Sequence, residues 1–108
     1  MITIDKKASK EKWFDYDEDV KFKIRPFPIS VRSLRPGANA SFMELLYKQA
    51  TYCLVDWSGI KSIDGEEVPY SDENKEFIFN YSEAIIQWIC VQSAVINNDI
   101  INVSKKKI

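Results

Sequence analysis

The sequence predicts an α+β fold, in which an N-terminal antiparallel β-hairpin packs on about three α-helices. Three observations support this prediction. Apolar and polar residues alternate over residues 11–25, as they do in a half-buried hairpin. From residue 41 onward, the apolar spacing changes to that of an amphipathic helix. Ser71 and Ser82 each precede a further helical run that they can cap.

The composition is typical of one globular domain. The chain has 108 residues, of which 45% are hydrophobic and 29% charged, so we expect a single domain over 1–108. Residues 1–10 and 104–108 are mostly polar, and we expect both ends to fray. Fifteen basic and sixteen acidic residues give a net charge of -1. Nonspecific nucleic-acid binding needs an excess of Lys and Arg, so we expect no nucleic-acid partner.

Several features indicate the compartment. No run approaches the ~20 apolar residues that span a bilayer, and the N-terminus lacks the apolar stretch of a signal peptide. Cys53 and Cys90 lie in apolar, helix-like runs, which is typical of buried thiols rather than of a disulfide framework. We therefore expect a cytoplasmic protein without a membrane partner.

The hairpin can be predicted pair by pair, with residues 17–19 as a three-residue loop. The expected pairs are Tyr16 with Val20, Asp15 with Lys21, Phe14 with Phe22, Trp13 with Lys23, Lys12 with Ile24, and Glu11 with Arg25. One face is apolar and the other charge-complementary, as a half-buried pair requires. Pro26 and Pro28 end the second strand. The alternation that follows allows a short third strand over 29–32.

Three helices are expected after this region. The first covers 41–57, with Ser41 or Asn39 as its cap and Gly59 just past its end. Shorter runs predict helices over 71–80 and 82–97. The last is apolar on nearly all sides, so it is either central to the core or partly used for a partner, including oligomerisation. Residues 97–99 end it, and residues 100–103 can add a short strand or docking segment.

The residue types exclude most catalytic chemistry. Without histidine, the chain lacks His-based acid–base catalysis, Ser–His or Cys–His nucleophiles and most zinc sites. Its three glycines stand alone and build no phosphate-binding loop. Asp15-x-Asp17-x-Asp19 begins like a calcium loop, but Val20 replaces the required Gly and Pro26 the bidentate Glu. We expect no enzyme activity, no cofactor and no metal.

The connector between the first two helices is the most distinctive segment of the chain. Residues 56–76 hold seven acids and two lysines, which indicates either an acidic loop surface or a docking patch for a basic partner. Asp64-Gly65 is a turn signal and Pro69 a helix breaker. Ile63 and Val68 flank the turn and predict a small hairpin.

Five short motifs follow one another along the chain. They are Val20-Lys-Phe-Lys-Ile-Arg-Pro26, Trp57-Ser-Gly59, Asp64-Gly65, Pro69-Tyr-Ser-Asp-Glu-Asn74 and the Ile-rich stretch from Ile85 to Ile96. Their order and spacing resemble the small tail assembly chaperone-like proteins of tailed phages and prophages. The resemblance covers residues 13 to about 97.

This resemblance implies a non-enzymatic helper in virion tail assembly, one that binds the tape-measure protein or a tail-tube component before polymerisation. A structural head–tail connector or minor tail subunit is the alternative. The candidate interaction residues are Trp57, Gly59, Asp64, Gly65, Pro69, Tyr70, Ser71, Asn74 and Trp88. Each can also be purely structural, as an anchor, a turn former or a helix cap.

Overall fold

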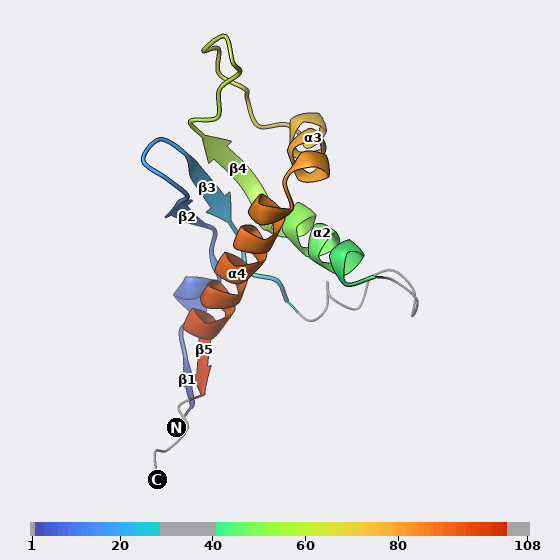
Figure 1. Cartoon of the computed structure of the whole chain (residues 1–108). Coiled ribbons are helices and arrows are strands. Elements are labelled where there is room, and N and C mark those ends of the chain that lie inside the picture. Colours follow the sequence, from blue (N-terminus) through green and yellow to red (C-terminus); the bar gives the residue numbers. More distant parts are fainter. Residues whose placement is uncertain (1, 29–40, 104–108) are drawn as a thin grey trace.

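The computed structural model describes residues 2–28 and 41–103 (Figure 1). Its elements are β1 (Ile2–Ile4), the 3-10 helix η1 (Lys6–Ser9), β2 (Lys12–Asp15), β3 (Lys21–Ile24), α2 (Phe42–Cys53), β4 (Leu54–Ser58), α3 (Asp72–Tyr81), α4 (Glu83–Ile100) and β5 (Ile101–Val103). These strands and helices confirm the α+β prediction. The predicted third strand over 29–32 and the predicted fraying of 104–108 lie outside the described residues.

The hairpin β2–β3 forms in the predicted register. The paired residues are Lys12 with Ile24, Trp13 with Lys23, Phe14 with Phe22, and Asp15 with Lys21. At the turn, the Tyr16 N–H donates to the Val20 carbonyl at 2.9 Å. Glu11 differs from the prediction, because its carboxylate lies 3.6 Å from the Lys23 ammonium instead of pairing with Arg25. The apolar face of the hairpin packs on the core, as the alternation predicted.

The third strand of this sheet is β4, where the sequence predicted the end of a helix. The sheet order is β2-β3-β4, and α2 ends at Cys53 instead of continuing to residue 57. Leu54 pairs with Ile24 and Trp57 with Phe22, across a register shift that leaves Val55 as an extra residue. Such a bulge puts residues three apart on one face of a strand. The i, i+3 spacing of Leu54 and Trp57, which had indicated a helix, therefore suits this strand equally well.

Helices α3 and α4 begin where the serines predicted. The Ser71 hydroxyl accepts from the Asn74 N–H at 3.1 Å, and that of Ser82 accepts from the Ile85 N–H at 3.3 Å. The prediction that residues 97–99 end the last helix is wrong, since α4 continues to Ile100. The reason is that the Asn97 side chain does not cap the helix end but makes long-range hydrogen bonds. Its amide group bonds both the N–H and the carbonyl of Phe27, at 3.2 and 3.1 Å.

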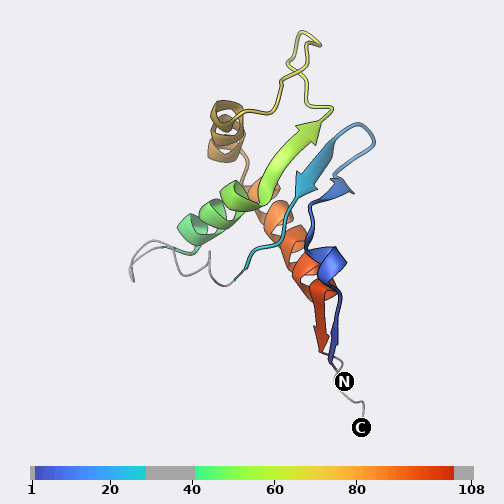
Figure 2. The ribbon, with the colours of Figure 1, turned by 180° about the vertical axis from the view of Figure 1, so that it is seen from behind.

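The two ends of the described chain form a two-stranded arm beyond the end of α4, visible from both sides (Figures 1 and 2). β1 pairs antiparallel with β5, which matches the predicted final strand. Residues 2–9 were predicted to fray, but they form β1 and η1 instead. The Asp5 N–H donates to the Ile100 carbonyl at 2.7 Å, and the Asp5 carboxylate accepts from the Lys7 N–H at the start of η1.

Helix α4 is central to the core. It packs against α2, α3, β3 and η1 and buries Ile86, Ile89, Cys90, Ser93 and Ile96. The other buried apolar residues are Phe22, Ile24, Phe27, Ala50, Cys53, Leu54, Trp57 and Phe79. The sequence left open whether the apolar residues of this helix serve the core or a partner. Those on its inner side serve the core. Val91 and Val95, on its outer side, are 57% and 40% exposed.

Candidate interaction site

The predicted candidate residues gather mainly at the base of the 59–71 connector, which joins β4 to α3. The Trp57 indole Nε1–H donates to the Val68 carbonyl at 2.8 Å, so the end of β4 is tied to the returning arm of the connector. The Trp57 and Tyr70 rings meet edge to face with their centroids 5.1 Å apart. Trp57 therefore anchors this connector, while its ring belongs to the hydrophobic core.

A buried lysine that the sequence analysis did not select lies beneath this base. Lys75 is only 7% exposed, and its ammonium donates to the carbonyls of Thr51 and Leu54 and to the Tyr70 hydroxyl, at 2.8, 3.1 and 3.0 Å. The Tyr70 hydroxyl also donates to the Leu54 carbonyl, at 3.1 Å. The two carbonyls belong to the last turn of α2 and to Leu54, the residue that caps its C-terminal end, where the helix dipole favours a cation. Lys75 thus joins α2, the connector and α3.

A sequence signal for Lys75 existed. It lies three and four residues before Ile78 and Phe79, so it occupies the apolar side of α3. A lysine at a core-facing helix position is rare unless its charge is hydrogen-bonded.

The segment from Pro69 to Asn74 closes the connector onto α3. The Asn74 side-chain amide donates to the Pro69 carbonyl at 2.9 Å, while its backbone N–H is capped by Ser71. Both candidates therefore stabilise the first turn of α3 and the chain entering it. Pro69 has no backbone N–H that would need a partner, so its carbonyl, which accepts from Asn74, is its only backbone hydrogen-bonding group.

Gly59 follows β4 and packs against the hairpin turn. It has φ +89°, and a Cβ atom at this position would lie 1.8 Å from the Asp19 carbonyl oxygen. Gly59 was expected just past the end of a helix, whereas it follows a strand in the structure. Only a residue without a side chain allows the hairpin turn and the connector to approach this closely.

The tip of the connector extends away from these residues. The Gly65 N–H donates to the Ser62 carbonyl at 3.0 Å and the Ser62 N–H to the Glu66 carbonyl at 2.8 Å, as expected of the predicted small hairpin. A bridge between Lys61 and Glu67 supports it. Asp64 and Gly65 are exposed at the turn, beside Ile63, whose side chain is fully exposed.

Trp88 lies apart from the other candidates. Its ring packs edge-on against Tyr16 at 5.1 Å and Phe14 at 6.4 Å, and also contacts Phe22 at 5.8 Å. It joins α4 to the hairpin, and this position gives it a structural role.

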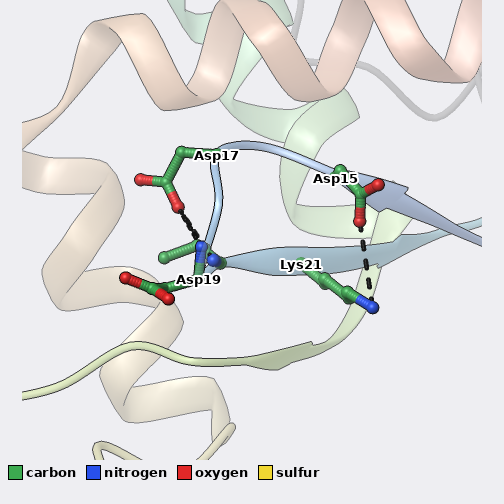
Figure 3. Close-up of polar contacts among 5 residues, drawn as sticks. Asp15, Asp17, Asp19 and Lys21 are labelled. Carbon is green, nitrogen blue, oxygen red and sulfur yellow. Dashed lines mark hydrogen bonds and ion pairs between the residues drawn. The ribbon is translucent and has the colours of Figure 1, made fainter.

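The aspartates that resembled the start of a calcium loop point in different directions (Figure 3). Asp17 accepts the backbone N–H groups of Asp19 and Val20 at 2.9 and 2.8 Å, so it stabilises the hairpin turn. Asp15 is directed toward Lys21, at 4.0 Å. Within residues 2–28 and 41–103, no three His, Cys, Asp or Glu side chains are grouped to hold a metal ion.

Both cysteines are free and buried. Burial raises the pKa of Cys53 to about 12 and that of Cys90 to about 11, so both thiols stay protonated near neutral pH. A protonated, inaccessible thiol is a poor nucleophile. Among the described helices, none has the length and apolar character needed to cross a bilayer.

A groove of about 670 Å³ lies between α2, α3 and the start of α4. Phe79 and Ile86, both buried, lie at its bottom, and Tyr47 packs edge to face on Phe79 at 5.9 Å. Local sequence patterns do not reveal this groove, because it forms only when three helices come together in the fold. We call it the α2–α3 groove.

Comparison with known protein families places most of the chain in a family. A family model described as YdaY prophage protein matches residues 15–107, which is most of the chain. Neither a curated protein nor a solved structure matches it. The match supports the phage or prophage part of the resemblance stated above, and no named relative supports the tail assembly chaperone part. The chain therefore belongs to the YdaY prophage protein family.

Proposed function

We propose that this prophage protein is a non-enzymatic chaperone of virion tail assembly, which binds the tape-measure or tail-tube protein in the host cytoplasm. The observation that carries the proposal is a set of large aromatic side chains on the surface of α2 and α3. Phe42, Phe77 and Tyr81 are 73%, 65% and 80% exposed. Exposed aromatic residues next to a groove are typical of surfaces that bind proteins.

The candidate residues at the base of the connector hold the scaffold together, and the proposed binding surface lies beside them on α2 and α3. Trp57, Tyr70, Ser71 and Asn74 are engaged in contacts that shape the connector. Cys53 and Cys90, the thiols of the described residues, are buried and have raised pKa values. A stable scaffold that carries an exposed apolar surface suits a protein that acts through contacts.

A structural head–tail connector or minor tail subunit is the second candidate, and the β1–β5 arm favours it. Ile2, Ile4 and Ile101 are 64%, 64% and 49% exposed on this short ribbon. An open strand edge can pair with a strand of a neighbouring subunit.

Deleting the gene from an inducible prophage distinguishes the two candidates when mass spectrometry of purified virions is added. A chaperone is required for tail formation but is absent from mature particles. A connector or tail subunit is required and is present in them at a fixed copy number. Normal infectious particles from the deletion strain would contradict both.

A further inference from the structure

The α2–α3 groove and the aromatic pair beside it share helix α3. Phe77 and Tyr81 lie four residues apart, so they occupy the same side of the helix, and their ring centroids are 5.1 Å apart. Phe79 and Asn80, between them in sequence, line the groove. One helix thus offers both a hollow with an apolar floor and an exposed aromatic ridge.

The charges on this surface are mainly negative. Asp72, Glu73 and Glu76 are exposed on α3, while Lys75, its single cation, is buried under the connector. Glu44 and Glu83 line the groove together with one cation, Lys48, so the carboxylates outnumber it. Glu76 precedes Phe79 and Asn80 by three and four residues, so it occupies the side of α3 that lines the groove. Burial raises the pKa of Tyr47, and the nearby charge of Glu76 raises it further, in agreement with this position.

These charges select the chemistry of the occupant. A second copy that docked through α3 would bring the same carboxylates face to face, and such like-charge contacts are unfavourable. A nucleic acid would be repelled for the same reason. A segment that carries Lys or Arg beside its apolar residues complements this surface.

The backbone of the surface selects the shape of the occupant. The groove is built mainly from α2 and α3, whose backbone groups are bonded within each helix. Strand addition needs an open sheet edge, which these helices do not offer. Recognition through side chains then suits an amphipathic helix that lies along the groove.

We propose that the α2–α3 groove and the Phe77–Tyr81 pair bind one amphipathic, basic helix of the partner. Apolar side chains of that helix enter the groove over Phe79, and its Lys or Arg side chains meet Glu76 and Glu44. The identity of the partner as the tape-measure or tail-tube protein rests on the proposed function, whereas the chemistry of the site does not.

The test uses the full chain and two kinds of probe. The first is the tape-measure and tail-tube proteins of the same prophage. The second is a pair of synthetic helical peptides with the same apolar residues, flanked by Lys in one and by Glu in the other. Three variants are compared with the unchanged chain: Glu76→Lys, the double variant Phe77→Ser/Tyr81→Ser, and Glu66→Lys as the charge-matched control at the connector tip.

We expect the Lys peptide to bind at least tenfold more tightly than the Glu peptide, and to shift the NMR signals of α2 and α3. Glu76→Lys and the double aromatic variant should each weaken that binding tenfold or more, as the loss of central interface residues does. Glu66→Lys should change it less than twofold. Circular dichroism of each variant shows whether it is folded.

The remaining outcomes separate this inference from the proposed function. If the unchanged chain binds a tail protein and the α3 variants bind it equally well, the groove is not the site and the inference is overturned. If no tail protein binds but the Lys peptide does so selectively, the inference stands and the proposed function fails. A dimer of the unchanged chain that Phe77→Ser/Tyr81→Ser abolishes would also overturn it, in favour of a second copy.

Discussion

Gly59 lies directly against the backbone of Asp19: a Cβ atom on Gly59 would be 1.8 Å from the Asp19 carbonyl oxygen. The contact fixes the hairpin turn against the start of the connector, although forty residues of sequence separate them. The obstacle is backbone, which cannot rotate away as a side chain can. The position of the connector on the sheet therefore depends on a missing side chain.

Gly59→Ala should destabilise the protein by about 3 kcal/mol or more, because the left-handed conformation and the steric overlap both oppose the methyl group. Gly65→Ala is the matched control. Gly65 also has positive φ, at +87°, but a Cβ atom there meets nothing within 4 Å. Gly65→Ala should therefore lower the free energy of unfolding by only about 1–2 kcal/mol. Urea denaturation of both variants measures the difference, and equal losses would contradict the close contact.

Lys75→Met should lower the free energy of unfolding by about 2 kcal/mol. The substitution keeps the length of the side chain but removes the donor to two carbonyls and the Tyr70 hydroxyl, and unsatisfied buried groups cost about 1–3 kcal/mol. The exposed Lys61→Met variant should stay within about 0.5 kcal/mol of the unchanged protein. A more stable Lys75→Met variant would instead mean that burying the cation outweighs its hydrogen bonds.

Asn97→Ala should destabilise by about 1–3 kcal/mol, since it removes two hydrogen bonds to the backbone of Phe27. The Phe27 amide should then exchange its hydrogen faster than it would if exchange required unfolding of the whole protein, because it has lost the acceptor that Asn97 provides. Asn98→Ala, at an exposed position of the same helix, should leave both properties nearly unchanged. Retained protection of Phe27 in Asn97→Ala would show that these hydrogen bonds are dispensable.

Stability should fall between about pH 9 and about pH 11. The folded state holds the pKa of Cys53 at about 12 and that of Cys90 at about 11, against an ordinary value of 9.0. In this range the unfolded chain loses both thiol protons while the folded chain keeps them, so rising pH favours unfolding. Below the unfolded pKa the thiols contribute no pH dependence. A Cys53→Ala/Cys90→Ala variant should show a shallower decline across this range, measured by thermal melts at each pH. An equally steep decline would assign the effect to other groups.

Local patterns predicted the hairpin and the starts of the helices well. The hairpin register follows from one apolar and one charged face, and both can be seen within fifteen residues of sequence. Ser41, Ser71 and Ser82 act as helix caps because capping needs only the hydroxyl and the next turn. These interactions are short in sequence, so a single chain reveals them.

Interactions between distant segments were not predictable in the same way. The boundary at Cys53 depends on the pairing of β4 with β3, and a bulge hid that strand behind a helix-like spacing. The helix continues through Asn97 because the Asn97 side chain bonds the backbone of Phe27, seventy residues away in sequence, and does not cap the helix end. The α2–α3 groove depends on how three helices meet, and the hydrogen-bond partners of Lys75 lie outside its own helix, at the end of α2 and in the connector. The periodicity of apolar residues along one segment carries no information about contacts between separate segments.

Co-expression with the tape-measure and tail-tube proteins of the same prophage, followed by affinity purification and size-exclusion chromatography, tests the central claim most directly. We predict that one of the two proteins co-elutes with this chain as a stable complex of fixed stoichiometry. The complex should dissociate more readily as the salt concentration rises, because the proposed surface is acidic. Elution of this chain by itself, with both tail proteins in separate fractions at low salt, would contradict the account.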